Sequence, residues 1–162
     1  MIFVTVGAQM SFDRLIGWVD DWAEAEGRDD LVAQIGPSEY VPRRLKVIPF
    51  MDPPEFRRRV EESDLIIAHA GMGSIINALE IGKPIVVVPR LASLEETRND
   101  HQGATARRLA SEGLVVSAET PEELAQRISE LETRGADAKI AEIANDSLIA
   151  RIRQFSGSGS GR

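Results

Sequence analysis

The sequence predicts an α/β fold, a Rossmann-like parallel sheet with helices on both faces. Short apolar runs of strand length alternate along the chain with amphipathic stretches of helical length, which is the pattern of βα units around a parallel sheet. Two of these runs, Leu65 to Ala68 and Ile85 to Val88, are apolar throughout, as expected for strands that helices cover on both faces. The 162 residues, 43% hydrophobic and 28% charged, are typical of one soluble globular domain.

The strands are predicted from the apolar runs in chain order. They span Ile2–Val6, Leu31–Ile35, Leu45–Pro49, Asp64–Ala70, Pro84–Pro89 and Leu114–Ser117. A longer loop is expected between Arg90 and Asp100, after the fifth of these strands.

The helices are predicted from periodicity and capping residues. In order, they are Phe12 to about Glu26 after a cap at Ser11, a helix that starts at Asp52, Gly73–Ile81 closed by Gly82, His101 to about Glu112, a helix from the capping box at Thr120 to about Glu132, and Ala138 to about Phe155. Asp52 and Thr120 each precede a proline at the first helical position and a glutamate three residues on, which is a helix-start pattern. Gly82 with Pro84 just beyond is a helix-stop pattern.

One domain over residues 1–155 and a flexible Gly/Ser tail over 156–162 are expected. The net charge of −7 and the pI of about 4.9 disfavour broad nucleic-acid binding, because a negative field repels phosphate backbones. The absence of cysteine excludes disulfides, thiolate zinc sites and cysteine nucleophiles. Two histidines cannot form a three-histidine metal site. Neither a metal nor a cofactor is therefore expected.

No apolar run approaches the roughly 20 residues of a membrane-spanning helix. The first residues, Met1 to Val4, lack the basic region of a signal peptide and are interpreted as a strand. A cytoplasmic location is the resulting expectation.

A glycine-rich turn is the sharpest local feature. His69-Ala70-Gly71-Met72-Gly73-Ser74 stands where a buried strand is followed by a helix. Glycines let the backbone approach a ligand closely, and the free N–H groups of a helix start bind anions. A diphosphate would fit this site; a tight turn without a ligand is the alternative.

Familiar nucleotide motifs do not match this turn. A dinucleotide fingerprint needs glycine or alanine where Ile76 stands, and an acid near Pro89–Arg90. Gly82-Lys83 is not a Walker loop, because Asn77 occupies the earlier glycine position and Pro84 replaces the Ser/Thr. A nucleotide diphosphate bound by helix dipoles, without a metal, remains.

A polar segment, Arg98-Asn99-Asp100-His101-Gln102, ends the long loop. Its amides, acid and imidazole offer the mixed donors and acceptors that sugar hydroxyls need. Helix capping by Asn99 or Asp100, with a solvated His101, is the alternative interpretation.

Three motifs in this order and spacing carry a family resemblance: "VTVGAQMSFDRL", "DLIIAHAGMGSIINALEIGKPIVVVPR" and "NDHQ". Residues 1 to about 132 resemble the C-terminal domain of family 28 glycosyltransferases, which is one half of a GT-B enzyme. The chain is most similar to soluble small subunits of two-component transferases. These are the catalytic subunit of the dolichol-pathway UDP-N-acetylglucosamine transferase and bacterial exopolysaccharide subunits of the PssE-like type.

The resemblance implies a UDP-sugar site and assigns its residues. The substrate-binding residues it implies are Gly7 at the cleft, Phe50 and Met51 at the uracil, Gly71, Met72, Gly73 and Ser74 at the phosphates, Asn77 at the ribose, and Asn99, His101 and Gln102 at the sugar. Asn77 replaces the family's ribose-binding glutamate, and an amide binds a hydroxyl more weakly than a carboxylate does. No catalytic residue is assigned, because the resemblance places acceptor binding, and with it the expected base, on a partner chain.

The expected function is that of the donor-binding subunit of an inverting, metal-independent glycosyltransferase. It would transfer a hexosyl, hexuronosyl or N-acetylhexosaminyl residue to a polyprenyl-diphosphate-linked saccharide in exopolysaccharide or glycolipid synthesis. A membrane-anchored partner would supply the other GT-B half and hold the chain at the inner membrane face. A non-catalytic scaffold with a degenerate nucleotide site and a UDP-sugar epimerase-like protein are the alternatives.

Three smaller features have two interpretations each. His69 either presents its ring to the diphosphate or satisfies buried backbone groups at the strand end, and the second is favoured. Arg57-Arg58-Arg59 is interpreted as a solvated helix face, with docking to an acidic partner or anionic lipid as the alternative. Trp18 and Trp22 are interpreted as packing residues that would mark a subunit interface if exposed.

Overall fold

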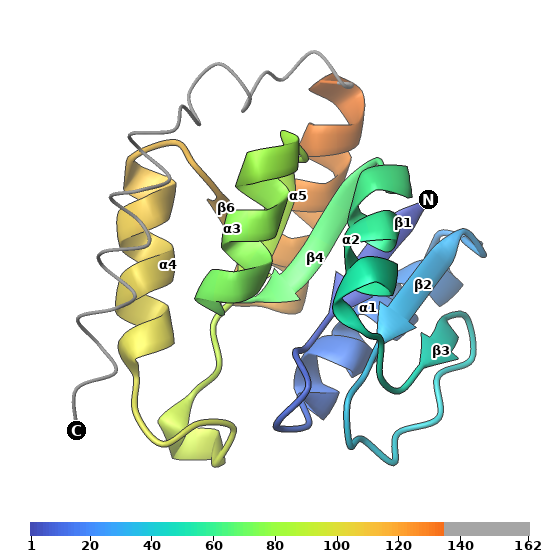
Figure 1. Cartoon of the computed structure of the whole chain (residues 1–162), viewed down its shortest axis with the longest axis horizontal. Helices are drawn as coiled ribbons and strands as arrows, with labels where there is room; N and C mark the ends of the chain where they lie inside the picture. Colours follow the sequence, from blue (N-terminus) through green and yellow to red (C-terminus); the bar gives the residue numbers. More distant parts are fainter. Residues whose placement is uncertain (135–162) are drawn as a thin grey trace.

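The computed structural model describes residues 1–134 of the chain (Figure 1). The strands are β1 Ile2–Thr5, β2 Leu31–Gln34, β3 Lys46–Ile48, β4 Leu65–His69, β5 Ile85–Val88 and β6 Val116–Ser117. The helices are α1 Asp13–Ala25, α2 Pro53–Glu62, α3 Met72–Ile81, the 3₁₀ turn η1 Ala92–Leu94, α4 His101–Ser111 and α5 Pro121–Arg134. The predicted helix at Ala138–Phe155 and the Gly/Ser tail at 156–162 lie outside the described residues.

The strands form one parallel sheet in the order β3-β2-β1-β4-β5-β6. The chain runs from β1 outward through β2 to β3, and then returns to pair β4 with the other side of β1. The strand order therefore reverses between β1 and β4. In open parallel sheets ligands bind outside the carboxyl ends of the strands at such a switch point. The predicted Rossmann-like fold class is confirmed, and its topology defines where a site is to be sought.

Helices cover both faces of the sheet, and each face has its own apolar core. On one side α1 and α5 pack through side chains such as Leu15, Val19 and Ile128. On the other side α2, α3 and α4 pack through side chains such as Val60 and Ile75, in agreement with the arrangement in Figure 1. The four residues of β1, which lies in the middle of the sheet, are all buried. Near-continuous apolar strands are thus explained by burial on both faces.

Helix boundaries follow the predicted signals with one exception. Asp52 accepts a hydrogen bond from the Glu55 N–H at 2.8 Å, and Thr120 accepts one from the Glu123 N–H at 3.1 Å. The predicted cap at Ser11 is wrong, because Phe12 occupies the N-cap of α1 and no side chain caps that end. Phe12 is buried, with the guanidinium groups of two arginines over its ring, so packing of this ring decides where the helix begins.

The two tryptophans of α1 and the three consecutive arginines of α2 make contacts within the domain. Trp18 and Trp22 are partly buried against the α1–α5 core and are covered by arginine guanidinium groups at 4.7 and 5.3 Å from their rings. The three consecutive arginines of α2 form ion pairs with glutamates of the same helix. Within residues 1–134 no helix combines the length and the apolar character needed to cross a bilayer.

A buried carboxylate holds the long connection between β2 and β3 in place. Asp20 of α1 is fully buried and accepts hydrogen bonds from the backbone N–H groups of Arg43 and Arg44 at 2.9–3.1 Å. Burial opposes ionisation of this side chain, but those N–H donors and the Arg43 guanidinium together hold its pKa below the ordinary value. One carboxylate thus fixes the backbone of a connection that contains no helix.

Replacing Asp20 with alanine is expected to lower the free energy of unfolding by about 2 kcal/mol at pH 7, because two partly buried backbone N–H groups lose a charged acceptor. The folded-state pKa lies below the ordinary aspartate value, so this stabilisation is complete above that value and is lost as the pH falls through the folded-state pKa. Urea denaturation at pH 7 and at pH 3 measures both effects. Asp21→Ala is the matched control, because that neighbouring side chain is 73% exposed and its loss should cost no more than about 0.5 kcal/mol. Equal costs for the two variants would contradict the prediction.

Candidate functional site

The predicted site residues all follow the carboxyl ends of strands, along the lower border of the sheet in Figure 1. Gly7 follows β1; Phe50 and Met51 follow β3; Gly71, Met72, Gly73, Ser74 and Asn77 follow β4 and lie in the first turns of α3 or just before it; Asn99, His101 and Gln102 follow β5 and open α4. Parallel pairing brings these ends to one edge. The residues therefore share the edge at which a doubly wound sheet binds ligands.

The centre of this edge is a histidine ring between two glycines. A Cβ on Gly7 would lie 3.0 Å from the Nε2 atom of His69, and a Cβ on Gly71 would lie 2.1 Å from its Cε1 atom. Gly7 also has a φ of 78°, which side-chain-bearing residues rarely adopt. The backbones after β1 and β4 thus both approach the imidazole closely, and the absence of side chains at both positions makes this approach possible.

The first turn of α3 presents its N–H groups without a competing side chain. Gly71 occupies the N-cap with no side-chain cap, and the turn contains no acidic residue. The first N–H groups of a helix have no acceptor within the helix, and here they belong to Met72, Gly73 and Ser74. Among the described residues, a Cβ on Gly73 would meet no atom within 4 Å. The positive end of the helix dipole consequently faces open space, which is the arrangement that binds phosphate groups.

His69 is electrostatically unusual. Burial, with the neighbouring charge of Arg90 as the second cause, lowers the pKa of its imidazole to about 4. Its Nδ1 atom is buried and has no hydrogen-bond partner among the described residues. The interpretation that this ring satisfies buried backbone groups is therefore wrong. Above about pH 4 the ring is uncharged, and it lies close to both glycine backbones.

The lowered pKa of His69 predicts a pH dependence of stability. The unfolded chain binds this proton near pH 6.5, whereas the folded protein binds it only near pH 4. Between these values the unfolded state carries more protons, so stability falls as the pH is lowered from about 6.5 to about 4. His69→Gln should remove this part of the slope. Urea denaturation across the range measures the slope, and identical slopes for the two proteins would contradict the prediction.

Phe50 and Met51 use their side chains differently. Phe50 is 58% exposed, so its ring is free at the edge of the sheet. Met51 and Met72 instead pack against the core between the sheet and α2, α3 and α4. Both side chains are only partly buried, so each methionine can contact a ligand through its backbone and through the exposed part of its side chain.

Asn77 binds its own helix. Its Nδ2 atom donates to the Gly73 carbonyl at 2.9 Å. The side chain thus lies along the first turn of α3, and its amide oxygen remains the group with which it could accept a hydrogen bond from a ribose hydroxyl.

The polar segment before α4 is partly structural. The Asn99 side chain accepts a hydrogen bond from the His101 N–H at 3.1 Å, and Gln102 accepts one from the Arg90 N–H at 3.1 Å. Asp100 stands at the N-cap without a capping bond and accepts from the Ala92 N–H at 3.0 Å instead. The capping interpretation is confirmed for Asn99, and His101 is exposed. Among residues 1–134, the glycine turn contributes nothing to a hollow at this end, whose lining residues are Asn99, Asp100, His101, Ala104, Thr105 and Arg108.

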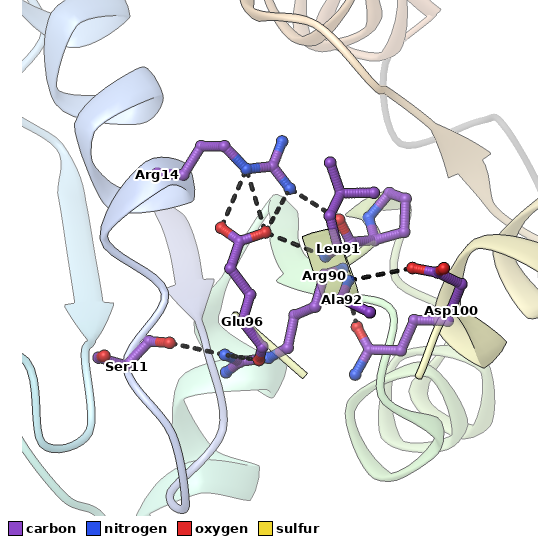
Figure 2. Close-up of polar contacts among 9 residues, drawn as sticks. Ser11, Arg14, Arg90, Leu91, Ala92, Glu96 and Asp100 are labelled. Carbon is purple, nitrogen blue, oxygen red and sulfur yellow. Dashed lines mark hydrogen bonds and ion pairs between the residues drawn. The ribbon is translucent and has the colours of Figure 1, made fainter. Parts of the chain in front are cut away.

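One residue at this edge escaped the sequence reasoning. Arg90 follows β5 directly, is only 4% exposed, and donates to carbonyl oxygens on the segment after β1 (Figure 2). In the sequence, position 90 stands out only because the acid of a dinucleotide site is missing there. The available signal was an arginine immediately after a fully apolar strand, where the end of the sheet buries whatever follows.

The fold and the site together place this protein in the class of Rossmann-like α/β domains that have an open helix N-terminus at the switch point of the sheet. The chain belongs to the glycosyltransferase family 28 C-terminal domain, whose family model matches residues 1–152. It is thus a glycosyltransferase domain, as the three motifs predicted.

Curated relatives agree with this family. The chain is 37% identical over 124 residues to the human protein named UDP-N-acetylglucosamine transferase subunit ALG13, and 38% identical over 121 residues to the mouse protein of that name. These matches cover 69% and 68% of this chain. The chain spans about a tenth of the length of each relative, the matched part being 10% of it.

Solved structures share the fold. A crystal structure of MurG from Acinetobacter baumannii matches 94% of this chain with a TM-score of 0.61 and 22% identity, over 44% of its own length. A solution structure of ALG13 matches 83% of this chain with a TM-score of 0.57 and 24% identity, over 86% of its length. The predicted equivalence to the C-terminal half of a GT-B enzyme is confirmed at the level of the fold.

Proposed function

We propose that this chain is the donor-binding subunit of a two-component, inverting, metal-independent glycosyltransferase that uses a UDP-sugar. The observation that carries the proposal is the open N-terminus of α3 at the switch point of the sheet, with Gly7 and Gly71 close by. Family membership supports a glycosyl-transfer role, and the geometry supports an anionic donor. In this proposal the helix terminus stabilises the negative charge that develops on the departing UDP, which is an electrostatic contribution to transfer.

The ends of the donor are assigned to the flanks of this turn. The free ring of Phe50 offers a stacking surface for uracil, and the Met51 backbone offers hydrogen-bonding groups beside it. Asn77 would accept a hydrogen bond from the ribose. Asn99, His101 and Gln102 would contact the sugar, with Gln102 fixed by its hydrogen bond from Arg90. The site would thus hold base, diphosphate and sugar along one edge of the sheet.

A partner chain would complete the enzyme. The curated relatives are named as subunits, which supports a second chain in the enzyme. We assign the acceptor site and the catalytic base to a membrane-anchored partner at the cytoplasmic face. The acceptor would be a polyprenyl-diphosphate-linked saccharide of exopolysaccharide or glycolipid synthesis. N-Acetylglucosamine is the first sugar to test, because the relatives' name specifies it; glucose, galactose and glucuronic acid follow.

Calorimetric titration with UDP, first of this chain and then of the chain with its partner, tests the donor site. Saturable binding that persists in EDTA supports the proposal, and absence of binding in both preparations overturns it. The reconstituted pair, assayed against a panel of UDP-sugars, identifies the sugar, and the anomeric configuration of the product reports inversion or retention. Partner association without UDP binding would instead identify a scaffold.

A further inference from the structure

We propose that Arg90 is a positioning residue for the donor site: it fixes the loop after β1 to the loop after β5. This inference rests on the proposed function, because it concerns the geometry of the same site. The two loops, residues 6–12 and 89–100, flank the glycine turn on either side in Figure 1.

The hydrogen bonds of the Arg90 guanidinium join both loops. One terminal nitrogen donates to the Ser11 and Glu96 carbonyl oxygens at 2.7 and 3.2 Å. The other donates to the Val6 and Met10 carbonyl oxygens at 2.5 and 2.9 Å. Three of these carbonyls belong to the loop that contains Gly7. The position of that loop relative to β5 therefore depends on one side chain.

Arginine suits this task for a geometric reason. Four carbonyl oxygens converge on a planar group with donors in fixed directions, whereas a lysine ammonium carries only three donors on a flexible stem. The guanidinium also lies over the Phe12 ring, with its carbon 4.8 Å from the ring centroid. Lysine would keep the charge but could not satisfy the four carbonyls.

An ion pair joins the start of α1, which follows the first loop, to the loop after β5. Arg14 of α1 forms a two-pronged pair with Glu96 at 2.9–3.2 Å and also donates to the Pro89 carbonyl at 2.9 Å. Glu96 in turn accepts a hydrogen bond from the Leu91 N–H at 3.0 Å. Figure 2 shows Arg14 and Glu96 facing each other across the two segments. We call Arg14, Arg90 and Glu96 the Arg90 cluster.

The Arg90 cluster also contacts a residue predicted to bind the sugar, and it contributes positive charge near the proposed diphosphate site. The backbone N–H of Arg90 holds the Gln102 side chain. Its two arginines exceed its one glutamate by a single positive charge, and the field of Arg90 contributes to the lowered pKa of His69 beneath the glycines. A diphosphate bound at the α3 terminus would experience this potential without touching the guanidinium.

The experiment compares Arg90→Lys and Arg90→Met with Arg107→Met, an arginine of α4 that is 68% exposed. Amide hydrogen exchange reports the loops without a ligand, and calorimetry reports the affinity for UDP. In both Arg90 variants we expect exchange to accelerate together in residues 6–12 and 89–100, and the Kd for UDP to rise about tenfold or more. Arg107→Met should change neither quantity.

The lysine variant separates position from charge, and it remains informative if the methionine variant does not fold. Wild-type exchange and affinity in Arg90→Lys would overturn the positioning role and leave charge alone as the contribution. Faster exchange with unchanged affinity would also overturn it, because the loops would then not shape the site. Leu131→Ala truncates a buried side chain of α5 that lies with Met1 and Lys83 at the opposite edge of the sheet. This variant should be destabilised and yet retain wild-type UDP affinity, which distinguishes positioning from a general loss of stability. Failure of the wild-type protein to bind UDP would overturn the proposed function, whereas the exchange data judge the loop contacts independently.

Discussion

Replacing Gly73 with valine is expected to weaken UDP binding about a hundredfold or more and to abolish transfer by the reconstituted pair, with little change in stability. A Cβ at this position meets no protein atom within 4 Å, so the folded domain accommodates the new side chain. The space it occupies lies at the N–H groups of the first turn of α3, where the diphosphate is proposed to bind. Valine also suits a helix better than glycine does.

Gly73→Ala and the matched control Gly17→Ala complete this experiment. Gly17 lies on α1, and a Cβ there makes only an ordinary contact at 3.8 Å with the Tyr40 hydroxyl. We expect a graded loss of UDP affinity from alanine to valine at position 73 and no loss for Gly17→Ala. Partner association should survive in all three variants. Wild-type transfer by Gly73→Val would remove the diphosphate from this turn and favour a scaffold.

Replacing Gly71 with alanine is expected to have the opposite profile: a loss of about 3 kcal/mol in the free energy of unfolding, the cost of forcing atoms into a packed site. The added Cβ would lie 2.1 Å from the Cε1 atom of His69. The imidazole has little room to move, because the Gly7 backbone also lies against it, and a Cβ on Gly7 would be 3.0 Å from its Nε2 atom. The φ of −87° at Gly71 is accessible to any residue, so the expected cost is steric.

A double-mutant cycle with His69→Ala isolates this contact. Without the imidazole the methyl group of Gly71→Ala has room, so its cost should fall to about 1 kcal/mol or less. Urea denaturation of the four proteins measures the coupling free energy. A cost that is the same in both backgrounds would show that the histidine ring is not what excludes a side chain at position 71.

The fold could be predicted from local patterns because its helices and strands are strongly amphipathic or fully apolar. The predicted ends of helices and strands were wrong where tertiary packing determined them. Burial of Phe12 moved the start of α1 past Ser11. β6 is shorter than the predicted Leu114–Ser117, because Leu114 and Val115 pack into the core beside α4 ahead of the paired residues. Neither event has a signature within a few residues of sequence.

The candidate site likewise has features that local sequence predicts and features that only long-range contacts determine. The glycine turn was predictable because strand, glycines and helix start are contiguous, and the parallel sheet brings the other predicted segments to the same edge. The role of Arg90 was not predictable, because its hydrogen bonds join positions 79 to 84 residues apart. The sequence likewise could not show that the His69 Nδ1 atom is buried without a hydrogen-bond partner among the described residues, because burial depends on the packing of the whole domain.

The Arg90 cluster has a consequence for engineering donor preference. The connections at the other edge of the sheet are short, such as residues 82–84 between α3 and β5. Loops at the carboxyl edge are natural candidates for grafting from related transferases. Residues 6–12 and 89–100, however, share one guanidinium and form a single unit of exchange. Transplanting either alone would leave carbonyls or an arginine without partners, so a chimaera must carry both loops together with Arg14.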